Sequence, residues 1–213
     1  FRYGLNKYRM WRRPYHVWNR TDSKSRWKSI QNNIDSEDGS AIDIGCASGF
    51  LTKKLSEKGL FSIGVEFDEK RLKESRALYS EEEGLSFSRY RVGPENIENL
   101  PSTDICLLLT VYHHWTAHYG PENAENMLRI VSVNSDKIFF ELPKDLEKNN
   151  MFETSIDLDS DQGFRDKHIE FVEKVLPGSQ FKLIHKAEYP FVEDREDFMF
   201  LIDCSNITSM DQF

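Results

Sequence analysis

The sequence predicts an α/β fold, in which a seven-stranded, mostly parallel sheet has helices on both faces and an N-terminal helical arm precedes it. Three observations support this prediction. Short apolar segments alternate with longer segments at helical spacing. A glycine-containing turn follows the first apolar segment. The chain has 213 residues, which suits one domain with one sizeable core.

Strands are expected where short apolar or alternating segments lie between turn residues, at 41–45, 61–66, 86–92, 104–111, 137–142, 181–189 and 197–204. Helices are expected between them, at 50–59, 68–84, 121–132 and 166–178. The segment 32–40 is polar and rich in turn residues. We therefore expect an arm over residues 1–39 and the sheet-forming body over residues 40–213.

The arm is basic and aromatic, whereas the body is acidic. Residues 1–28 carry nine lysines and arginines against one aspartate, although the whole chain has a net charge of -8. This asymmetry indicates an anionic partner, such as a phosphate, a nucleic acid or a charged surface. In the alternative interpretation the arm is an amphipathic helix whose aromatic side chains dock on the body while its cations stay solvated. The two are compatible if the arm covers a site for an anionic substrate.

Several classes of protein do not fit the composition. No apolar run approaches the roughly 20 residues of a membrane-spanning helix, so we expect a soluble chain. The three cysteines are widely spaced, which argues against a disulfide framework or a thiolate zinc site and favours the cytoplasm. The first residue is Phe1 rather than Met, so what precedes it stays open, as does the oligomeric state.

The turn after the first strand, "DIGCASGF" at 43–50, is the first candidate site. Ligands of parallel α/β sheets bind at the carboxyl ends of the strands. Gly45 and Gly49 permit a tight turn and a close backbone approach, and the following helix offers free N–H groups. The turn is neither a Walker A loop nor a G-x-G-x-x-G loop. Glu66 ends the second strand, where an acid can accept hydrogen bonds from ribose hydroxyls.

"AIDIGCASGF" followed by "IGVEFD" resembles the first two motifs of the class I S-adenosylmethionine-dependent methyltransferases, which have a Rossmann-like fold. The resemblance covers about residues 40–204 and implies S-adenosyl-L-methionine as cofactor. The usual aspartate beside the adenine is absent from "GPENI" (93–97), so Glu95 or Asn96 would replace it. The resemblance implies a cofactor site formed by Asp43, Gly45, Cys46, Ala47, Gly49, Phe50, Glu66, Phe67, Glu95, Asn96 and Thr110.

The fourth strand continues into "LTVYHHWTAHYG" (109–120), the second candidate site. This segment is similar to the methyltransferase domain of the bacterial methyltransferase–kinases that terminate O-antigen chains, which also has a His-His pair followed by a strand ending in Glu-Leu. A second resemblance, to the RNA methylphosphate capping enzymes, lacks the His-His pair. Both groups methylate phosphate oxygens. No kinase motif lies in this chain.

Three hypotheses compete for the histidines of this segment. A metal site would use His114, His118 and Glu141, but we expect no regular helix there and this class rarely needs a metal, so none is predicted. As a general base, a neutral histidine would take a proton from a hydroxyl. As an anion site, a histidine would donate to phosphate. We expect His113, His114 and Tyr112 to be catalytic, and the acceptor to contact Arg9, Arg12, Arg26, Trp115 and His118.

The sequence thus predicts an O-methyltransferase that acts on a phosphate or sugar oxygen of an anionic small molecule or glycan, as in polysaccharide biosynthesis. The alternative is an RNA methyltransferase that acts on a 5'-phosphate or a ribose and binds the nucleic-acid backbone with its basic arm. The loss of RNA affinity with rising salt would favour the alternative.

Overall fold

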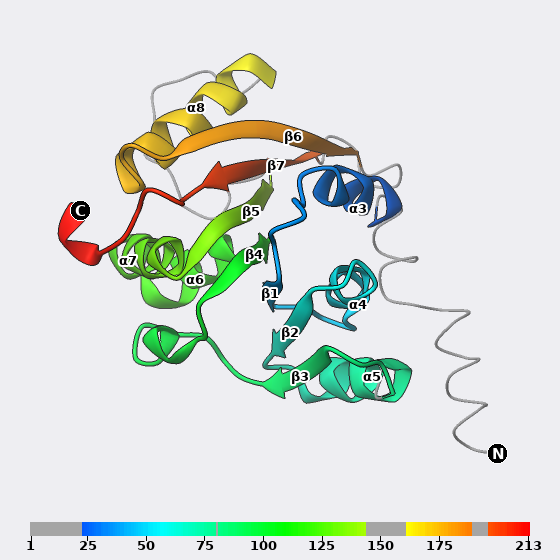
Figure 1. Cartoon of the computed structure of the whole chain (residues 1–213). Coiled ribbons are helices and arrows are strands. Elements are labelled where there is room, and N and C mark those ends of the chain that lie inside the picture. The colour runs from blue at the N-terminus through cyan, green and yellow to red at the C-terminus, as the bar shows by residue number, and fades with distance from the viewer. Residues whose placement is uncertain (1–22, 80, 144–160, 189–195) are drawn as a thin grey trace.

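One seven-stranded sheet organises the computed structural model, which describes residues 23–79, 81–143, 161–188 and 196–213 (Figure 1). Its order is β3-β2-β1-β4-β5-β7-β6. Strands β1 to β5 are parallel, and β7 runs antiparallel to both β5 and β6. The predicted fold class is confirmed. The strands are β1 (Ser40–Ile44), β2 (Phe61–Glu66), β3 (Leu85–Arg89), β4 (Thr103–Leu109), β5 (Ser135–Pro143), β6 (Gln180–Glu188) and β7 (Glu196–Asp203).

Helices cover both faces of the sheet (Figure 1). One face carries α3 (Ser23–Gln31), α4 (Phe50–Ser56) and α5 (Glu69–Tyr79), and the other carries α6 (Tyr112–Tyr119), α7 (Pro121–Val133) and α8 (Asp161–Val175). Two short 3-10 helices, η1 (Ile97–Asn99) and η3 (Met210–Gln212), complete the described elements. Each face has its own apolar core. None of the described helices has the length and apolarity to cross a membrane.

The two core clusters explain why these segments pack as they do. Leu51 and Leu55 of α4 meet Ile105 and Leu107 of β4 on one face of the sheet. The neighbouring residues of β4 point to the opposite face, where they pack with α7 and α8. β4 is therefore apolar on both faces, as its continuous apolar run predicts.

The sheet changes direction between β1 and β4. From β1 the chain builds outward to β2 and β3, and then returns to place β4 on the other side of β1, with Ala41 opposite Ile105. Such a reversal opens a crevice at the carboxyl ends of the strands, which is where ligands bind in this architecture. Both candidate segments, 43–50 and 109–120, start from this crevice.

The expectation that residues after β4 form no regular helix is wrong, since 112–119 are α6. Histidine and aromatic residues have only middling helix propensity, so the local sequence carries a weak signal. Tertiary packing decides instead, because α6 buries Tyr112, Trp115 and Thr116. Gly120 ends the helix with a positive φ of 82°, and Pro121 begins α7.

Candidate active site

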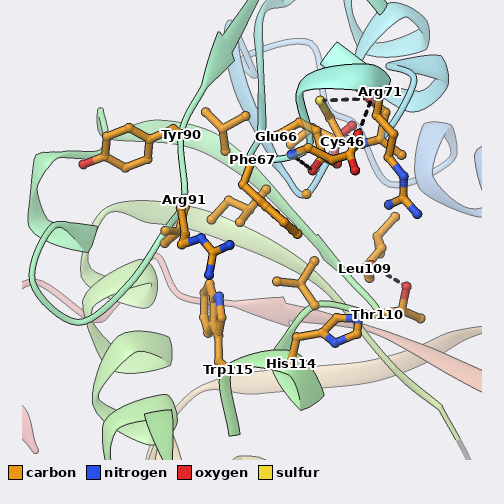
Figure 2. Close-up of a pocket in the computed structure, with 18 of the residues that line it drawn as sticks. Cys46, Glu66, Phe67, Arg71, Tyr90, Arg91, Leu109, Thr110, His114 and Trp115 are labelled. Carbon is orange, nitrogen blue, oxygen red and sulfur yellow. Dashed lines mark hydrogen bonds between the residues drawn. The ribbon is translucent and has the colours of Figure 1, made fainter. Parts of the chain in front are cut away.

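A pocket of about 610 Å³ lies at the carboxyl ends of β1, β2 and β4 (Figure 2). The turn after β1, the end of β2, the segment after β3 and one face of α6 form its walls. Its floor holds the buried carboxyl groups of Asp43 and Glu66, and its mouth holds arginine and histidine side chains. The pocket lining therefore combines acidic side chains, which include the half-buried Asp68, with arginine and histidine side chains.

The turn after β1 is held to the end of β2 by its backbone. The N–H groups of Gly45 and Cys46 both donate to the carbonyl oxygen of Val65, at 2.8 and 3.1 Å. Gly45 has a φ of +74°, and a Cβ atom there would lie 2.7 Å from Cγ2 of Val111. Only glycine fits this position, because it accepts the left-handed backbone and leaves room beside the start of α6. Cys46 is a buried thiol whose pKa is raised by desolvation.

Glu66 has a fixed carboxylate that faces this turn. Its side chain is 2% exposed, and Oε2 accepts a hydrogen bond from the N–H of Ala47 at 3.0 Å. Oε1 accepts a second one from the N–H of Asp68 at 2.8 Å. Each carboxylate oxygen can accept more than one hydrogen bond. Glu66 therefore keeps capacity for hydroxyl groups of a ligand.

Asp43 lies below the turn and supports it. Its Oδ2 accepts a hydrogen bond from Oγ1 of Thr52, on α4, at 2.7 Å. Burial raises the pKa of Asp43 to about 6, an effect opposed by the Thr52 hydrogen bond and by the positive charge of Arg26. The carboxyl group thus links β1 to α4 at the base of the pocket.

Arg26 reaches the pocket from α3 and forms an ion pair with Glu141 of β5. The two side chains are 2% and 0% exposed. The amphipathic-helix interpretation, in which the cations of the arm stay solvated, is therefore wrong for Arg26. The prediction that Arg26 contacts the acceptor stays a prediction: Arg26 lines the pocket, and its guanidinium also pairs with Glu141. Arg9 and Arg12 lie outside the described residues.

One face of α6 forms the wall opposite the turn. The residues that line the pocket recur at helical spacing: Val111, His114, Trp115, His118 and Tyr119. The helix thus pairs His114 with His118 and turns His113 away from this face. The rings of His113 and His114 remain neighbours, with centroids 4.0 Å apart.

Tyr112 lies in the core instead of at the pocket. It is 2% exposed and packs edge-on against Phe140 and Phe171. Burial, the largest influence, raises the pKa of its hydroxyl well above the ordinary value. The predicted catalytic role of Tyr112 therefore has no support in the geometry, because on α6 it points to the face opposite that of His114.

Four of the predicted cofactor residues lie away from the lining of the pocket. Gly49 has a φ of +77° and a Cβ there would lie 2.4 Å from Phe87, so glycine at this position lets the start of α4 pack closely against β3. Phe50 packs against the apolar core between α4 and the sheet. Asn96 accepts from the N–H of Gly93 and donates to the carbonyl of Arg91, which closes a turn. Glu95 is exposed on the same turn.

Thr110 does line the pocket, and its backbone is strained. Its φ is +55°, which is rare for a β-branched residue. Its N–H donates to the carbonyl oxygen of Glu141 at 3.0 Å, and its hydroxyl donates to the carbonyl of Leu109 at 2.7 Å. The tight turn directs the chain from β4 into α6.

The mouth of the pocket contains two arginines that the sequence did not single out. Arg71, on α5, and Arg91, after β3, both line the opening. The guanidinium carbon of Arg91 lies 4.8 Å from the ring centroid of Phe67, whose side chain is 52% exposed. Arg91 follows the carboxyl end of a strand, which is a usable sequence signal. Arg71 lies inside a helix with many charges, where nothing in the sequence marks it.

At the mouth of the pocket, the surroundings of His114 shift its pKa. Partial desolvation lowers the pKa of His114, and the nearby charges of His118 and Arg71 lower it further. His114 is therefore largely neutral near pH 7 and can either donate or accept a proton. Among the described residues, no cluster of three or more histidine, cysteine, aspartate or glutamate side chains is arranged to hold a metal.

Comparison with known proteins indicates what kind of protein this chain is similar to. Residues 42–133, which include both candidate segments, match a sequence family described as "Methyltransferase domain". The strand order and the turn after β1 agree with this match, and residues 42–133 are similar to a methyltransferase domain. More particularly, the chain is 27% identical over 107 residues to the O-antigen chain terminator bifunctional methyltransferase/kinase WbdD of Escherichia coli. That stretch covers 47% of this chain and 15% of the relative.

Solved structures show the same fold. A structure of the bifunctional kinase-methyltransferase WbdD matches with a TM-score of 0.68 at 20% identity, covering 86% of this chain and 40% of that one. The N-terminal domain of EvdMO1, solved with SAH bound, matches with a TM-score of 0.54 at 10% identity, covering 84% of this chain and 78% of that one. The chain thus corresponds to less than half of the WbdD chain.

Proposed function

We propose that this chain transfers a methyl group from S-adenosylmethionine to an oxygen of an anionic acceptor, either a phosphate or a sugar oxygen of a glycan. The observation that carries the proposal is that Glu66 and His114 line one pocket from opposite sides (Figure 2). Glu66 belongs to the wall formed by the glycine turn, and His114 belongs to the wall formed by α6. The wall with Glu66 suits the methyl donor, and the wall with His114 suits the acceptor.

The residues present fit the cofactor. The volume of about 610 Å³ lies within the roughly 300–1,000 Å³ of small-molecule sites. Gly45 leaves free the space that a Cβ would fill, and Glu66 can accept hydrogen bonds from ribose hydroxyls. The exposed ring of Phe67 offers a flat surface for a base. Asp43 and Glu66 also give the floor negative charge, which favours a cationic sulfonium ligand.

S-adenosylmethionine, if bound here, would supply an electrophilic methyl group: the acceptor oxygen would form the new O–C bond with a lone pair as the C–S bond breaks and its electron pair stays on sulfur. The protein contributes position and electrostatics. A phosphate oxygen is already ionised and needs only to be held in line. A sugar hydroxyl must lose its proton, and neutral His114 is placed to accept it.

The acceptor is inferred from the relatives and from the charge of the mouth. WbdD is named as an O-antigen chain terminator, which supports a glycan-related acceptor. Arg71, Arg91 and His114 place nitrogen-bearing groups where an anionic acceptor would enter. The RNA alternative depends on residues 1–28, and in their described part Arg26 is held by Glu141, whereas Lys24 and Lys28 are exposed.

Calorimetry with S-adenosylhomocysteine tests the cofactor part of the proposal. Glu66→Gln should weaken binding by at least about tenfold, because an amide is a poorer acceptor for two hydroxyl groups than a carboxylate. Glu98→Gln, in η1, is the matched control, because Glu98 is exposed and lies outside the pocket. Absence of any S-adenosylhomocysteine binding by the wild-type chain would disprove the proposal.

Methyl transfer from labelled S-adenosylmethionine tests the acceptor. Phosphorylated oligosaccharides, the same oligosaccharides without phosphate, and RNA with a 5'-phosphate should be compared at equal concentration. We expect an oligosaccharide to be labelled. Label only in the phosphorylated oligosaccharide would indicate a phosphate oxygen as acceptor, whereas label also in the oligosaccharide without phosphate would indicate a sugar oxygen. Label in the RNA alone would replace the glycan proposal by the RNA alternative.

A further inference from the structure

Nitrogen-bearing side chains, two of them arginines, converge on the mouth of the pocket from separate parts of the chain. Arg71 comes from α5, Arg91 follows β3, and His114 and His118 come from α6. The chain as a whole carries a net charge of -8, whereas the groups around this opening are two arginines and two histidines beside the carboxylate of Asp68. Such a focused potential attracts anions to the opening.

The two arginines differ in what they face. The guanidinium of Arg91 lies over the ring of Phe67, at 4.8 Å from its centroid, and this contact places it at the side of the pocket that Glu66 and Phe67 form. Arg71 and His114 enter the pocket from opposite sides (Figure 2). A group bound between α5 and α6 would therefore contact both Arg71 and His114.

The chemistry of this pair suits a phosphate. Arg71 is permanently charged, and its planar guanidinium can donate two parallel hydrogen bonds to phosphate oxygens. His114 can donate one further N–H while it is neutral. The pocket therefore does not need to desolvate a second full positive charge beside Arg71. The buried acids Asp43 and Glu66, at the ends of β1 and β2, repel the same anion from the wall that the glycine turn forms.

We infer that Arg71 and His114 bind the phosphate group of the methyl acceptor and distinguish it from the methylated product. This inference rests on the proposed function and adds a residue, Arg71, and a reason for product release. A phosphomonoester carries up to two negative charges, and methylation of one oxygen leaves a diester with one. Arg71 therefore holds the acceptor more tightly than the product.

Two small probes isolate this effect. Methyl phosphate stands for the acceptor and dimethyl phosphate for the methylated product. Each is titrated at about pH 8, where the monoester is a dianion, into protein saturated with S-adenosylhomocysteine and is followed by phosphorus NMR. The wild type should bind methyl phosphate more tightly than dimethyl phosphate. Arg71→Gln should lower the affinity for methyl phosphate about tenfold and nearly abolish the preference.

Lys73→Gln is the matched control, since Lys73 lies on the same helix with a side chain that is 74% exposed and outside the pocket. It removes the same charge and should leave both affinities unchanged. His114→Gln should reduce the affinity for methyl phosphate less than Arg71→Gln. Equal effects of Arg71→Gln and Lys73→Gln would overturn the inference, because they would indicate general charge attraction.

Binding of S-adenosylhomocysteine separates the two proposals. If Arg71→Gln weakens it tenfold, then Arg71 belongs to the cofactor and the inference is wrong. If the wild type binds S-adenosylhomocysteine but shows no preference between the phosphate probes, the inference fails while the cofactor site stands. If the wild type does not bind S-adenosylhomocysteine at all, the proposed function fails and the inference fails with it.

Discussion

Arg26 and Glu141 form a buried ion pair across 115 residues of sequence. Arg26 also lines the pocket, so the pair connects α3 to the sheet directly beside the candidate active site. A buried ion pair adds little net stability over an apolar pair, but loss of one partner leaves a buried charge without compensation. The pair therefore fixes where α3 docks.

We expect Arg26→Met to lower the free energy of unfolding by about 3–5 kcal/mol, because the buried Glu141 then loses the guanidinium with which it forms an ion pair. Arg26→Met combined with Glu141→Leu should recover much of that loss. Denaturant unfolding of the single and double variants measures both effects. Lys73→Met, which removes one partner of an exposed ion pair with Glu69, should have a much smaller effect. Equal losses for the two single variants would contradict the assigned role.

Gly45→Ala should both destabilise the chain and block the pocket. The added Cβ would meet Val111 at 2.7 Å in a backbone of positive φ. Gly59→Ala is the control, because its φ is +97° but nothing lies within 4 Å of the added atom. Both variants should lose roughly 1 kcal/mol from backbone strain, and only Gly45→Ala should also weaken S-adenosylhomocysteine binding. Addition of Val111→Ala should restore that binding in part, whereas failure to do so would argue against the contact.

Asp43 predicts a specific pH dependence of stability. Its pKa is about 6 in the folded chain and 3.8 as the ordinary value. Between these values the folded chain keeps a proton that the unfolded chain has lost, so stability falls as the pH rises. The Asp43→Asn variant lacks this dependence. The difference in unfolding free energy between Asp43→Asn and the wild type should therefore shift in favour of the variant by up to about 3 kcal/mol between about pH 4 and about pH 7.5. Denaturant unfolding at both pH values measures the change, and parallel profiles would contradict it.

The helical phase of α6 predicts how the three histidines rank. His114→Ala and His118→Ala should each reduce methyl transfer more than His113→Ala does, because only the first two line the pocket. Initial rates with the acceptor found above provide the comparison, with thermal unfolding as a check on folding. If His113→Ala causes the largest loss, the assignment of the α6 face is wrong.

The fold could be predicted because its signals are strong and local. Apolar runs such as 104–111 and the turn at Gly45 are fixed by burial and by backbone geometry. The predicted seven-stranded, mostly parallel sheet is confirmed. The helix at 112–119 could not be predicted, because its residues have middling propensity and only packing of Tyr112 and Trp115 selects a helix.

The site could be predicted only in part, for a related reason. Glu66 is marked by its place at a strand end, and the structure places it in the pocket as expected. Arg71 carries no such mark, since its position depends on how α5 packs across from α6. Without the helix, the adjacent pair His113 and His114 also looked like the natural unit. The 3.6-residue period of α6 makes His114 and His118 the unit instead.

The close approach of Gly45 and Val111 has an evolutionary consequence. These two positions share one small volume, so a larger side chain at either one demands a smaller side chain at the other. Relatives that carry alanine or serine at position 45 should therefore carry a reduced side chain at position 111. Libraries that aim to change the acceptor by varying the start of α6 should keep the residue at 111 no larger than valine, or vary both positions together.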